Sequence, residues 1–518
     1  MSRGWLGAAA GIAAVTVASR VVGFGRIAVL SRTLGTSCLG DTYSAANALP
    51  NVVFEVVAGG ALASLVVPVL AGAVAAGDRQ TASRTASALL TWTVLILTPL
   101  TVLGLLAAPT LLRAVTGTQP SCGRPMLAVG TRMLVVFLPQ IVLYGIGIVL
   151  AGVLQAHRRF LAPALAPLLS SLVVIAAYLL YAGQGRPPLT ALNRPQELTL
   201  SVGTTLGVAV LSLGLLVPLR HCELTLRPSL SFPPGVAARV QRLALAGVAG
   251  LAAQQLALVV ALRLAAHGPE GSVVVFQVAT ALFLLPWAVL AVPVATSAFP
   301  SLAASAQAGR EGDYARTAAH ALVAVLVGTL GAVAVLIAVA GPAARVLVAG
   351  APGAGSVSAL TRSTVAFAPG LVGYGVLALV GRALYARGDG RTPAVATVAG
   401  WLTVAIADVV LVAAAPARDR VVALGLGNSI GMTVAGGLLL FGLHRVGAPA
   451  VEGAARTAAV GLLACVLACG GALLLPRFGS SLPTSLLSGL LLAAGSAGIY
   501  LAVVRLLQPA ALRILLRA

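Results

Sequence analysis

The sequence predicts an all-α integral membrane protein, with about fourteen membrane-spanning helices in two six-helix lobes and two extra C-terminal helices. Three observations predict this class. Of the 518 residues, 59% are hydrophobic and only 9% are charged, whereas soluble proteins carry roughly 25% charged residues. Apolar runs long enough to cross a bilayer recur along the chain, and part of the sequence repeats at a fixed offset. This composition excludes a disordered chain, a disulfide-built scaffold and a soluble nucleic-acid-binding protein.

The individual spans follow from length and hydrophobicity. A helix needs about 20 mostly apolar residues to cross a bilayer. The first candidate is too long and too interrupted by arginine to be a cleaved signal peptide. In chain order the predicted spans are 6–30, 42–73, 85–109, 128–154, 160–182, 198–219, 240–266, 272–302, 317–341, 360–385, 392–415, 420–443, 454–475 and 483–507.

The arginines predict how the chain is oriented. All 33 basic residues are arginines, against 12 acidic residues. If the N-terminus is cytoplasmic, the cytoplasmic loops hold 19 arginines, the opposite loops hold 11, and three lie within spans. Basic residues concentrate in cytoplasmic loops, so we expect both termini in the cytoplasm. The same excess favours contact with anionic membrane lipids.

A repeat at an offset of 230 residues divides the chain into two halves. Thr131-Arg132, Phe137, Pro139 and Tyr144-Gly145 recur as Thr361-Arg362, Phe367, Pro369 and Tyr374-Gly375. The repeat unit is six spans, an even number, so the two lobes are expected to run parallel around a central cavity, as in alternating-access transporters. We predict an N-terminal lobe over 1–219, an amphipathic cytoplasmic linker over 220–239, a C-terminal lobe over 240–443 and two additional spans within 444–518.

Polar groups inside the first two spans mark a candidate site. A charge near the bilayer centre costs about 2.5–3.5 kcal/mol on insertion scales and is a functional suspect by default. Arg20 and Arg26 lie in the first span, and guanidinium groups match phosphate oxygens in a bidentate manner. The second span carries Asp41, Asn51 and Glu55. Arg26 could instead snorkel to an interface, and Asp41 could be a helix N-cap. We expect Arg20 or Arg26 to supply the counter-charge of Glu55.

The second lobe offers a smaller polar group. Asp408 stands alone among the apolar residues of the eleventh span, Asn428 lies in the twelfth, and Gln255 lies in the seventh. A buried carboxylate beside amides could bind Na⁺ or a proton, or it could form a structural hydrogen bond between helices.

The sequence gives no indication of an enzyme or of a resident cofactor. It has no paired-carboxylate motif, no histidine metal cluster, no phosphate-binding glycine loop and no nucleophile elbow. The five cysteines have no metal-ligand spacing, and Cys465 and Cys469 are interpreted as packing residues within a span.

The first two predicted spans and their junction carry Ser19-Arg20 to Gly23-Phe24-Gly25-Arg26, Gly40-Asp41, Leu49-Pro50-Asn51, Gly59-Gly60-Ala61 and Val67-Pro68, and the eighth span carries Leu285-Pro286 and Phe299-Pro300. With these motifs the chain resembles the MurJ/MviN family of lipid II flippases. The pattern of Phe54-Glu55 followed by Gly59-Gly60 resembles the actinobacterial branch of that family. The resemblance implies the fold of multidrug and oligosaccharidyl-lipid exporters. It also implies peptidoglycan biosynthesis in a bacterial plasma membrane, with lipid II moved to the outer leaflet by alternating access and with cell-wall synthases as partners.

The resemblance also implies roles for particular residues. It places Arg20, Arg26 and Asp41 in the substrate cavity, and Asp408, Asn428 and the position of Gln255 in helices that form the sodium site of the family. Two cavity arginines of the family are replaced, one by Phe54 and one by Ala281. A flippase for another polyprenyl-linked saccharide and a cation-coupled drug exporter of the same fold therefore stay open as alternatives.

Overall fold

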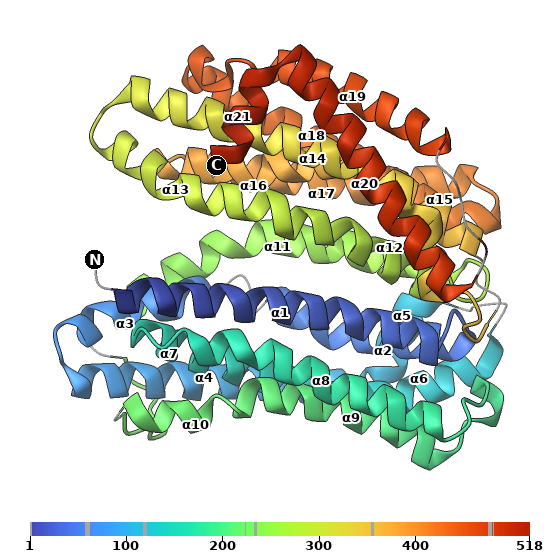
Figure 1. Ribbon diagram of the computed structural model, residues 1–518. Coiled ribbons are helices and arrows are strands. Elements are labelled where there is room, and N and C mark those ends of the chain that lie inside the picture. The colour runs from blue at the N-terminus through green and yellow to red at the C-terminus, as the bar shows by residue number, and fades with distance from the viewer. Residues whose placement is uncertain are drawn as a thin grey trace. The chain divides into compact units, whose positions relative to one another are not determined.

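The computed structural model describes residues 3–56, 63–117, 122–222, 224–232, 236–353, 357–474, 479 and 481–517. These residues form helices joined by short loops, so the predicted all-α class is confirmed (Figure 1). By contact density the chain divides into two units. Unit 1 contains Met1–Gln255 and Ala351–Ala354, and unit 2 contains Leu256–Gly350 and Gly355–Ala518. The division falls inside α11, later than the predicted linker 220–239, and the lobe boundaries themselves stay a prediction.

In unit 1, α1 packs beside α8, α8 beside α9, and α7 lies against α3, α4 and α9. Its core gathers where α3, α4 and α7 meet, with Leu70, Leu89 and Leu150 buried. The helices of this unit, with α11 crossing its boundary, are α1 (Arg3–Thr33), α2 (Cys38–Phe54), α3 (Ala63–Ala75), α4 (Arg79–Leu106), α5 (Ala108–Thr116), α6 (Gly123–Phe137), α7 (Gln140–Ala156), α8 (Leu161–Gly183), η2 (Leu189–Ala191), α9 (Arg194–Leu213), α10 (Leu216–Leu219), η3 (Arg220–Cys222) and α11 (Val236–Ala266).

In unit 2, the long helix α14 packs against α16, α19 and α20, and α18 packs against α15, α16 and α17. The buried side chains of Leu322, Leu379 and Leu439 join α14, α16 and α18 in one core. The helices are α12 (Ser272–Pro286), η4 (Trp287–Ala291), α13 (Val292–Gln307), α14 (Glu311–Val348), α15 (Val357–Phe367), α16 (Gly370–Ala386), α17 (Arg391–Ala414), η5 (Ala417–Asp419), α18 (Arg420–Val446), η6 (Ala448–Val451), α19 (Ala454–Leu474), α20 (Leu482–Leu507) and α21 (Pro509–Arg517).

Local sequence explains where several helices begin. The Ser37 side chain accepts from the Gly40 N–H and starts α2, and Asp78 accepts from the Thr81 N–H and starts α4. Asn193 and Gln196 form a capping box at α9, in which each side chain bonds the backbone of the other residue. Such caps satisfy the N–H groups that the first turn of a helix leaves unpaired.

Within the described residues, twelve helical segments are long and apolar enough to cross a membrane, or thirteen if the bent pair α15 and α16 is one span. The predicted second span corresponds to α2 and α3, and residues 57–62 between them lie outside the described residues, so the total of fourteen stays a prediction. Large apolar side chains such as Leu180, Leu474 and Leu506 are exposed. An apolar exterior of this extent is expected where lipid replaces water.

Both copies of the sequence repeat fold into the same structure, a helix interrupted at a proline. In unit 1, α6 ends at Phe137 and α7 begins at Gln140. In unit 2, α15 ends at Phe367 and α16 begins at Gly370, with an angle of 43° between the two helices. Proline has no N–H and cannot continue the hydrogen-bond ladder, so Pro139 and Pro369 explain the two interruptions.

Candidate functional site

The two arginines of the first span lie on one continuous helix, since α1 passes through Gly23 and Gly25 without a break. Arg20 is exposed, whereas Arg26 is half-buried. A Cβ added at Gly23 or Gly25 would meet no atom within 4 Å, so the stretch between the two arginines borders open space. The Cα atoms of Arg20 and Arg26 are therefore about 9 Å apart along the helix axis, by the rise of 1.5 Å per residue.

The charge of Arg26 acts on three tyrosine side chains of unit 1. These are Tyr43, Tyr144 and Tyr178, which come from α2, α7 and α8. The Tyr43 hydroxyl is 2.9 Å from the Tyr178 hydroxyl and 2.6 Å from that of Thr204 on α9. Four helices thus contribute polar or aromatic side chains to this part of unit 1, within the electrostatic reach of Arg26.

Asp41 is fully buried in the first turn of α2. It does not cap the helix as considered from the sequence, because Ser37 does so, accepting from the Gly40 N–H at 3.2 Å. A carboxylate in the first turn still interacts favourably with the helix dipole.

The other two candidate residues of the second span, Asn51 and Glu55, lie at the C-terminal end of α2. The Asn51 amide donates to the Asn47 carbonyl at 2.8 Å, a contact within its own helix. Glu55 is exposed, and no ion pair joins it to Arg20 or Arg26 in the described part of the chain. Both Glu55 and Arg26 act electrostatically on Tyr144, so that tyrosine is within reach of both charges.

Phe54, at a position where the resemblance leads us to expect an arginine, packs on the same tyrosine. The Phe54 and Tyr144 ring centroids are 4.3 Å apart. Unit 2 has a matching contact at the repeated position, where Tyr374 lies 4.7 Å from the ring of Trp287. Ala281, the other replaced position, is half-buried on α12. Phe54 thus gives Tyr144 an apolar neighbour.

In unit 2, Asp408 is buried against the backbone of α18. Its Oδ1 atom has no hydrogen-bond partner and lies where a Cβ on Gly427 would stand, 2.0 Å from that ideal position. Asn428, the residue after Gly427 on α18, is also buried, and its unpartnered Nδ2 atom is directed toward Gly370. Asp408 and Asn428 thus lie on the contacting helices α17 and α18, and each has one buried polar atom without a hydrogen-bond partner.

Gln255, the third candidate for a sodium site, is the last residue of unit 1 and is buried with an unpartnered Oε1 atom. Among the described residues no three His, Cys, Asp or Glu side chains gather as metal ligands. Any cation here would rest on one carboxylate together with amide and backbone oxygens. Gly59 and Gly60, which belong to the motifs of the family resemblance, lie outside the described residues.

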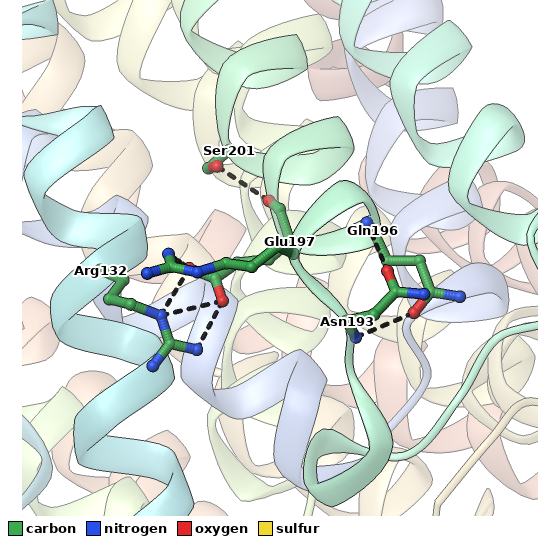
Figure 2. Close-up of polar contacts among 6 residues, drawn as sticks. Arg132, Asn193, Gln196, Glu197 and Ser201 are labelled. Carbon is green, nitrogen blue, oxygen red and sulfur yellow. Dashed lines mark hydrogen bonds and ion pairs between the residues drawn. The ribbon is translucent and has the colours of Figure 1, made fainter.

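The structure adds an ion pair that the sequence analysis missed (Figure 2). Arg132 on α6 binds Glu197 in the first turn of α9, with its Nε atom 3.0 Å from both carboxylate oxygens and one Nη atom 2.6 Å from Oε2. Arg194 approaches the same carboxylate at 3.4 Å. The Glu197 side chain is only 3% exposed.

A second missed feature is a disulfide between Cys38, at the start of α2, and Cys122, just before α6. The expected topology puts both cysteines on the outer side, where disulfides persist. Cys222, Cys465 and Cys469 are free thiols.

Taken together, the helical spans, the broken repeat helices and the intramembrane arginines define a multi-pass membrane protein with the fold of a transporter. The family model described as "Lipid II flippase MurJ" matches residues 30–490. The chain therefore belongs to the MurJ family.

Individual relatives agree with this assignment. The chain is 27% identical over 386 residues to a probable lipid II flippase MurJ of Rhizobium tropici, covering 74% of this chain and 71% of that protein. It is 26% identical to the lipid II flippase MurJ of Burkholderia cenocepacia, covering 84% and 83% of the two chains.

Solved structures share the fold. A lipid II flippase MurJ in an inward closed conformation matches with a TM-score of 0.75 and 18% identity, over 96% of this chain and 98% of the other. An inward-facing multidrug transporter of the MATE family matches with a TM-score of 0.68 and 16% identity, over 83% and 95%.

Proposed function

We propose that the protein moves lipid II, the undecaprenyl-pyrophosphate-linked peptidoglycan precursor, from the cytoplasmic to the outer leaflet. Membership of the MurJ family supports this proposal, and the observation that carries it is Arg26 on α1, next to open space and within electrostatic reach of Tyr144. A guanidinium stays charged at any relevant pH and binds pyrophosphate oxygens in a bidentate manner. The hydroxyl group of the half-buried Tyr144 can donate a further hydrogen bond to the head group, whereas Tyr43 and Tyr178 are buried.

The proposed mechanism is alternating access. Arg20 and Arg26 bind the pyrophosphate from the cytoplasmic side while the polyprenyl tail stays in lipid. The protein then changes conformation, and the head group leaves on the outer side without a change in any covalent bond. A ligand shifts such an equilibrium only through its different affinity for the two states. The arginines therefore act by giving one state a higher affinity for lipid II than the other.

Complementation tests this function directly. In a bacterium depleted of its own flippase, the wild type should restore growth and Arg20→Ala/Arg26→Ala should not. Arg113→Ala is the matched control, since Arg113 is an exposed arginine of the same unit on α5. A lipid II photoprobe should label the purified wild type and Arg113→Ala more strongly than Arg20→Ala/Arg26→Ala. Equal rescue by the double variant would remove the arginines from the mechanism.

A different head group is the second candidate, favoured by the stacked Phe54 and Tyr144 rings where the family has an arginine. If the wild type reaches the membrane but does not rescue growth, the substrate is another polyprenyl-linked saccharide. In that case the photoprobe built on lipid II should also label the wild type no better than the double variant.

We further propose that Na⁺ drives the return step, bound by Asp408 with Asn428 of unit 2. The buried, unpartnered Asp408 Oδ1 atom supports this, because a buried oxygen without a partner is costly unless a cation satisfies it. Na⁺, but not an equal concentration of K⁺, should raise the thermal unfolding midpoint of the wild type. Asp408→Asn should abolish that rise. An equal rise in the variant would assign Asp408 to a structural role.

We propose a bacterial plasma-membrane location with both termini cytoplasmic and with anionic phospholipids bound near the C-terminus. Here α21 lies along a groove of about 570 Å³ that includes the side chains of Ser301, His320 and Arg513. An amphipathic helix with basic residues at the membrane surface attracts anionic lipid. In nanodiscs, phosphatidylglycerol should stabilise the wild type more than phosphatidylcholine does, and Arg513→Ala should reduce the difference. An unchanged difference would exclude this groove as the lipid site.

A further inference from the structure

The two helix breaks leave the same pair of backbone groups without an α-helical partner. In an unbroken helix the carbonyl of residue i accepts from the N–H of residue i+4. At the break between α15 and α16 this bond would join Ala366 to Gly370. In the other copy of the repeat it would join Val136 to Gln140. Inside a membrane such groups must find a partner in the protein, because no water is present.

In unit 2 a serine hydroxyl takes the place of the missing bond. Ser429 on α18 donates to the Ala366 carbonyl at 2.7 Å and accepts from the Gly370 N–H at 3.1 Å. Its hydroxyl oxygen is thus inserted between the donor and the acceptor that the break separates. Ser429 is 7% exposed, so this contact is shielded.

In unit 1 a threonine does the same at the equivalent carbonyl. Thr205 on α9 donates to the Val136 carbonyl at 3.0 Å and accepts from the Gln140 side chain at 2.8 Å. Val136 and Gln140 lie 230 residues before Ala366 and Gly370, the offset of the sequence repeat. The two units therefore carry the same device, built once with a backbone donor and once with a side-chain amide.

In each unit an ion pair also attaches the first half of the broken helix to the helix that supplies the hydroxyl. Arg132 of α6 binds Glu197 of α9. Arg362 of α15, its counterpart in the repeat, binds Asp419 at the start of α18. The half-helices α6 and α15 are thus attached at two points. The second half-helices carry Tyr144 and Tyr374, a few residues beyond each break.

We propose that Thr205 and Ser429 are positioning residues of the transport reaction. Each hydroxyl keeps the carbonyl at the break satisfied while α7 or α16 changes its angle relative to α6 or α15, so each break works as a hinge with a fixed pivot. In unit 1 this motion would carry Tyr144 relative to Arg26. The transport assay rests on the proposed function because lipid II is its substrate. The hinge itself is inferred from the geometry of the two breaks.

The first test compares binding with transport in proteoliposomes. Thr205→Val and Ser429→Ala should bind lipid II within about twofold of the wild type but flip it about tenfold more slowly, an effect of the size expected when a buried polar group loses its partner. Thr205→Ser and Ser429→Thr keep the hydroxyl and should restore the rate.

Ser201→Ala and Ser363→Ala are the matched controls, because each of these buried hydroxyls bonds only a carbonyl of its own helix. Both should flip lipid II at the wild-type rate. Wild-type rates in Thr205→Val and Ser429→Ala would overturn the proposal. So would a parallel fall in binding and flipping, which indicates a structural role alone.

A second measurement needs no change at the hydroxyls. Spin labels on exposed positions of α6 and α7, at Ala128 and Gln155, report the unit 1 break, and labels at Ser358 and Tyr385 report the unit 2 break. The three free cysteines are replaced beforehand. Each pair should give two distance populations whose ratio changes when lipid II is added.

A single distance at both breaks, with and without lipid II, would overturn the hinge. If the wild type neither binds nor flips lipid II, the proposed function fails. Two distance populations in the protein alone would then still support the hinge.

Discussion

Arg132 and Glu197 form a bidentate ion pair across 65 residues, and Arg362 and Asp419 repeat it in unit 2. The two pairs differ in burial. The carboxylate of Glu197 is 3% exposed, whereas the Asp419 side chain is 23% exposed and its arginine 46%. A buried carboxylate that loses its cation is left with an uncompensated charge, while an exposed pair contributes little.

We therefore expect different coupling energies for the two pairs. A double-mutant cycle with Arg132→Ala and Glu197→Ala, followed by thermal unfolding in detergent, should give about 1–3 kcal/mol. The cycle with Arg362→Ala and Asp419→Ala should give about 1 kcal/mol or less. Arg194→Ala is the control, since this 67% exposed arginine reaches Glu197 only at 3.4 Å. Equal couplings for the two pairs would show that burial is not what distinguishes them.

Gly373 marks the closest approach of α16 and α18. A Cβ at this position would lie 2.1 Å from the Met432 carbonyl oxygen, and a Cβ at Gly436 would lie 2.9 Å from the Cα of Gly373. Small residues allow helices in a membrane to approach in this way. Because the obstacle is backbone, Gly373→Ala should push the two helices apart and destabilise the protein by about 3 kcal/mol.

Gly437, the residue after Gly436 on α18, is the matched control. Its Cβ would meet no atom within 4 Å, so Gly437→Ala should be neutral or should stabilise by up to about 1 kcal/mol through helix propensity. The unfolding midpoints of the two variants in detergent decide the matter. Equal midpoints would mean that α16 and α18 do not cross at Gly373.

The Cys38–Cys122 disulfide closes a loop with a sequence separation of 84 residues. Reduction, or Cys38→Ser with Cys122→Ser, should lower the stability by about 2–4 kcal/mol in the chain-entropy account of cross-links. Under denaturing, non-reducing conditions alkylation should label three thiols, and after reduction five. Five labelled thiols without reduction would exclude the bond. In intact cells an impermeant maleimide should reach Cys38 and Cys122 only after reduction, which also tests the proposed orientation.

The sequence was sufficient for the all-α membrane class, the repeat and the family, because these depend on composition, periodicity and motifs. Contacts between distant residues were not predictable in the same way. The repeat singles out Arg132 and Arg362, but their partners lie 65 and 57 residues away, and no local pattern connects them.

The same limit applies to the hydroxyls at the breaks. Pro139 and Pro369 predict that a carbonyl loses its partner, but not which helix supplies a replacement. Thr205 and Ser429 are 224 residues apart, not 230, so the repeat does not align them. A search for hydroxyls on the last span of each lobe could have found them. The two cysteines of the disulfide could have been paired only by assuming that both lie on the outer side.

The last prediction concerns pH. Hydrogen bonds from the Thr392 side chain and from the N–H groups of Thr392 and Arg391 hold the pKa of Asp389 below its ordinary value, in the loop that starts α17. Since the folded pKa lies below the unfolded one, this carboxylate stabilises the fold fully above about pH 4 and loses that contribution as the pH falls through its folded pKa. At pH 7 Asp389→Ala should cost about 0.5–1 kcal/mol, a modest value for a half-exposed carboxylate that accepts from N–H groups of the first helical turn. The difference between wild type and variant in thermal unfolding should then shrink as the pH falls below about 4. Asp389→Asn, which keeps an acceptor but does not titrate, should show no such pH dependence in its own cap. A wild-type advantage that stays constant down to pH 2 would contradict the lowered pKa.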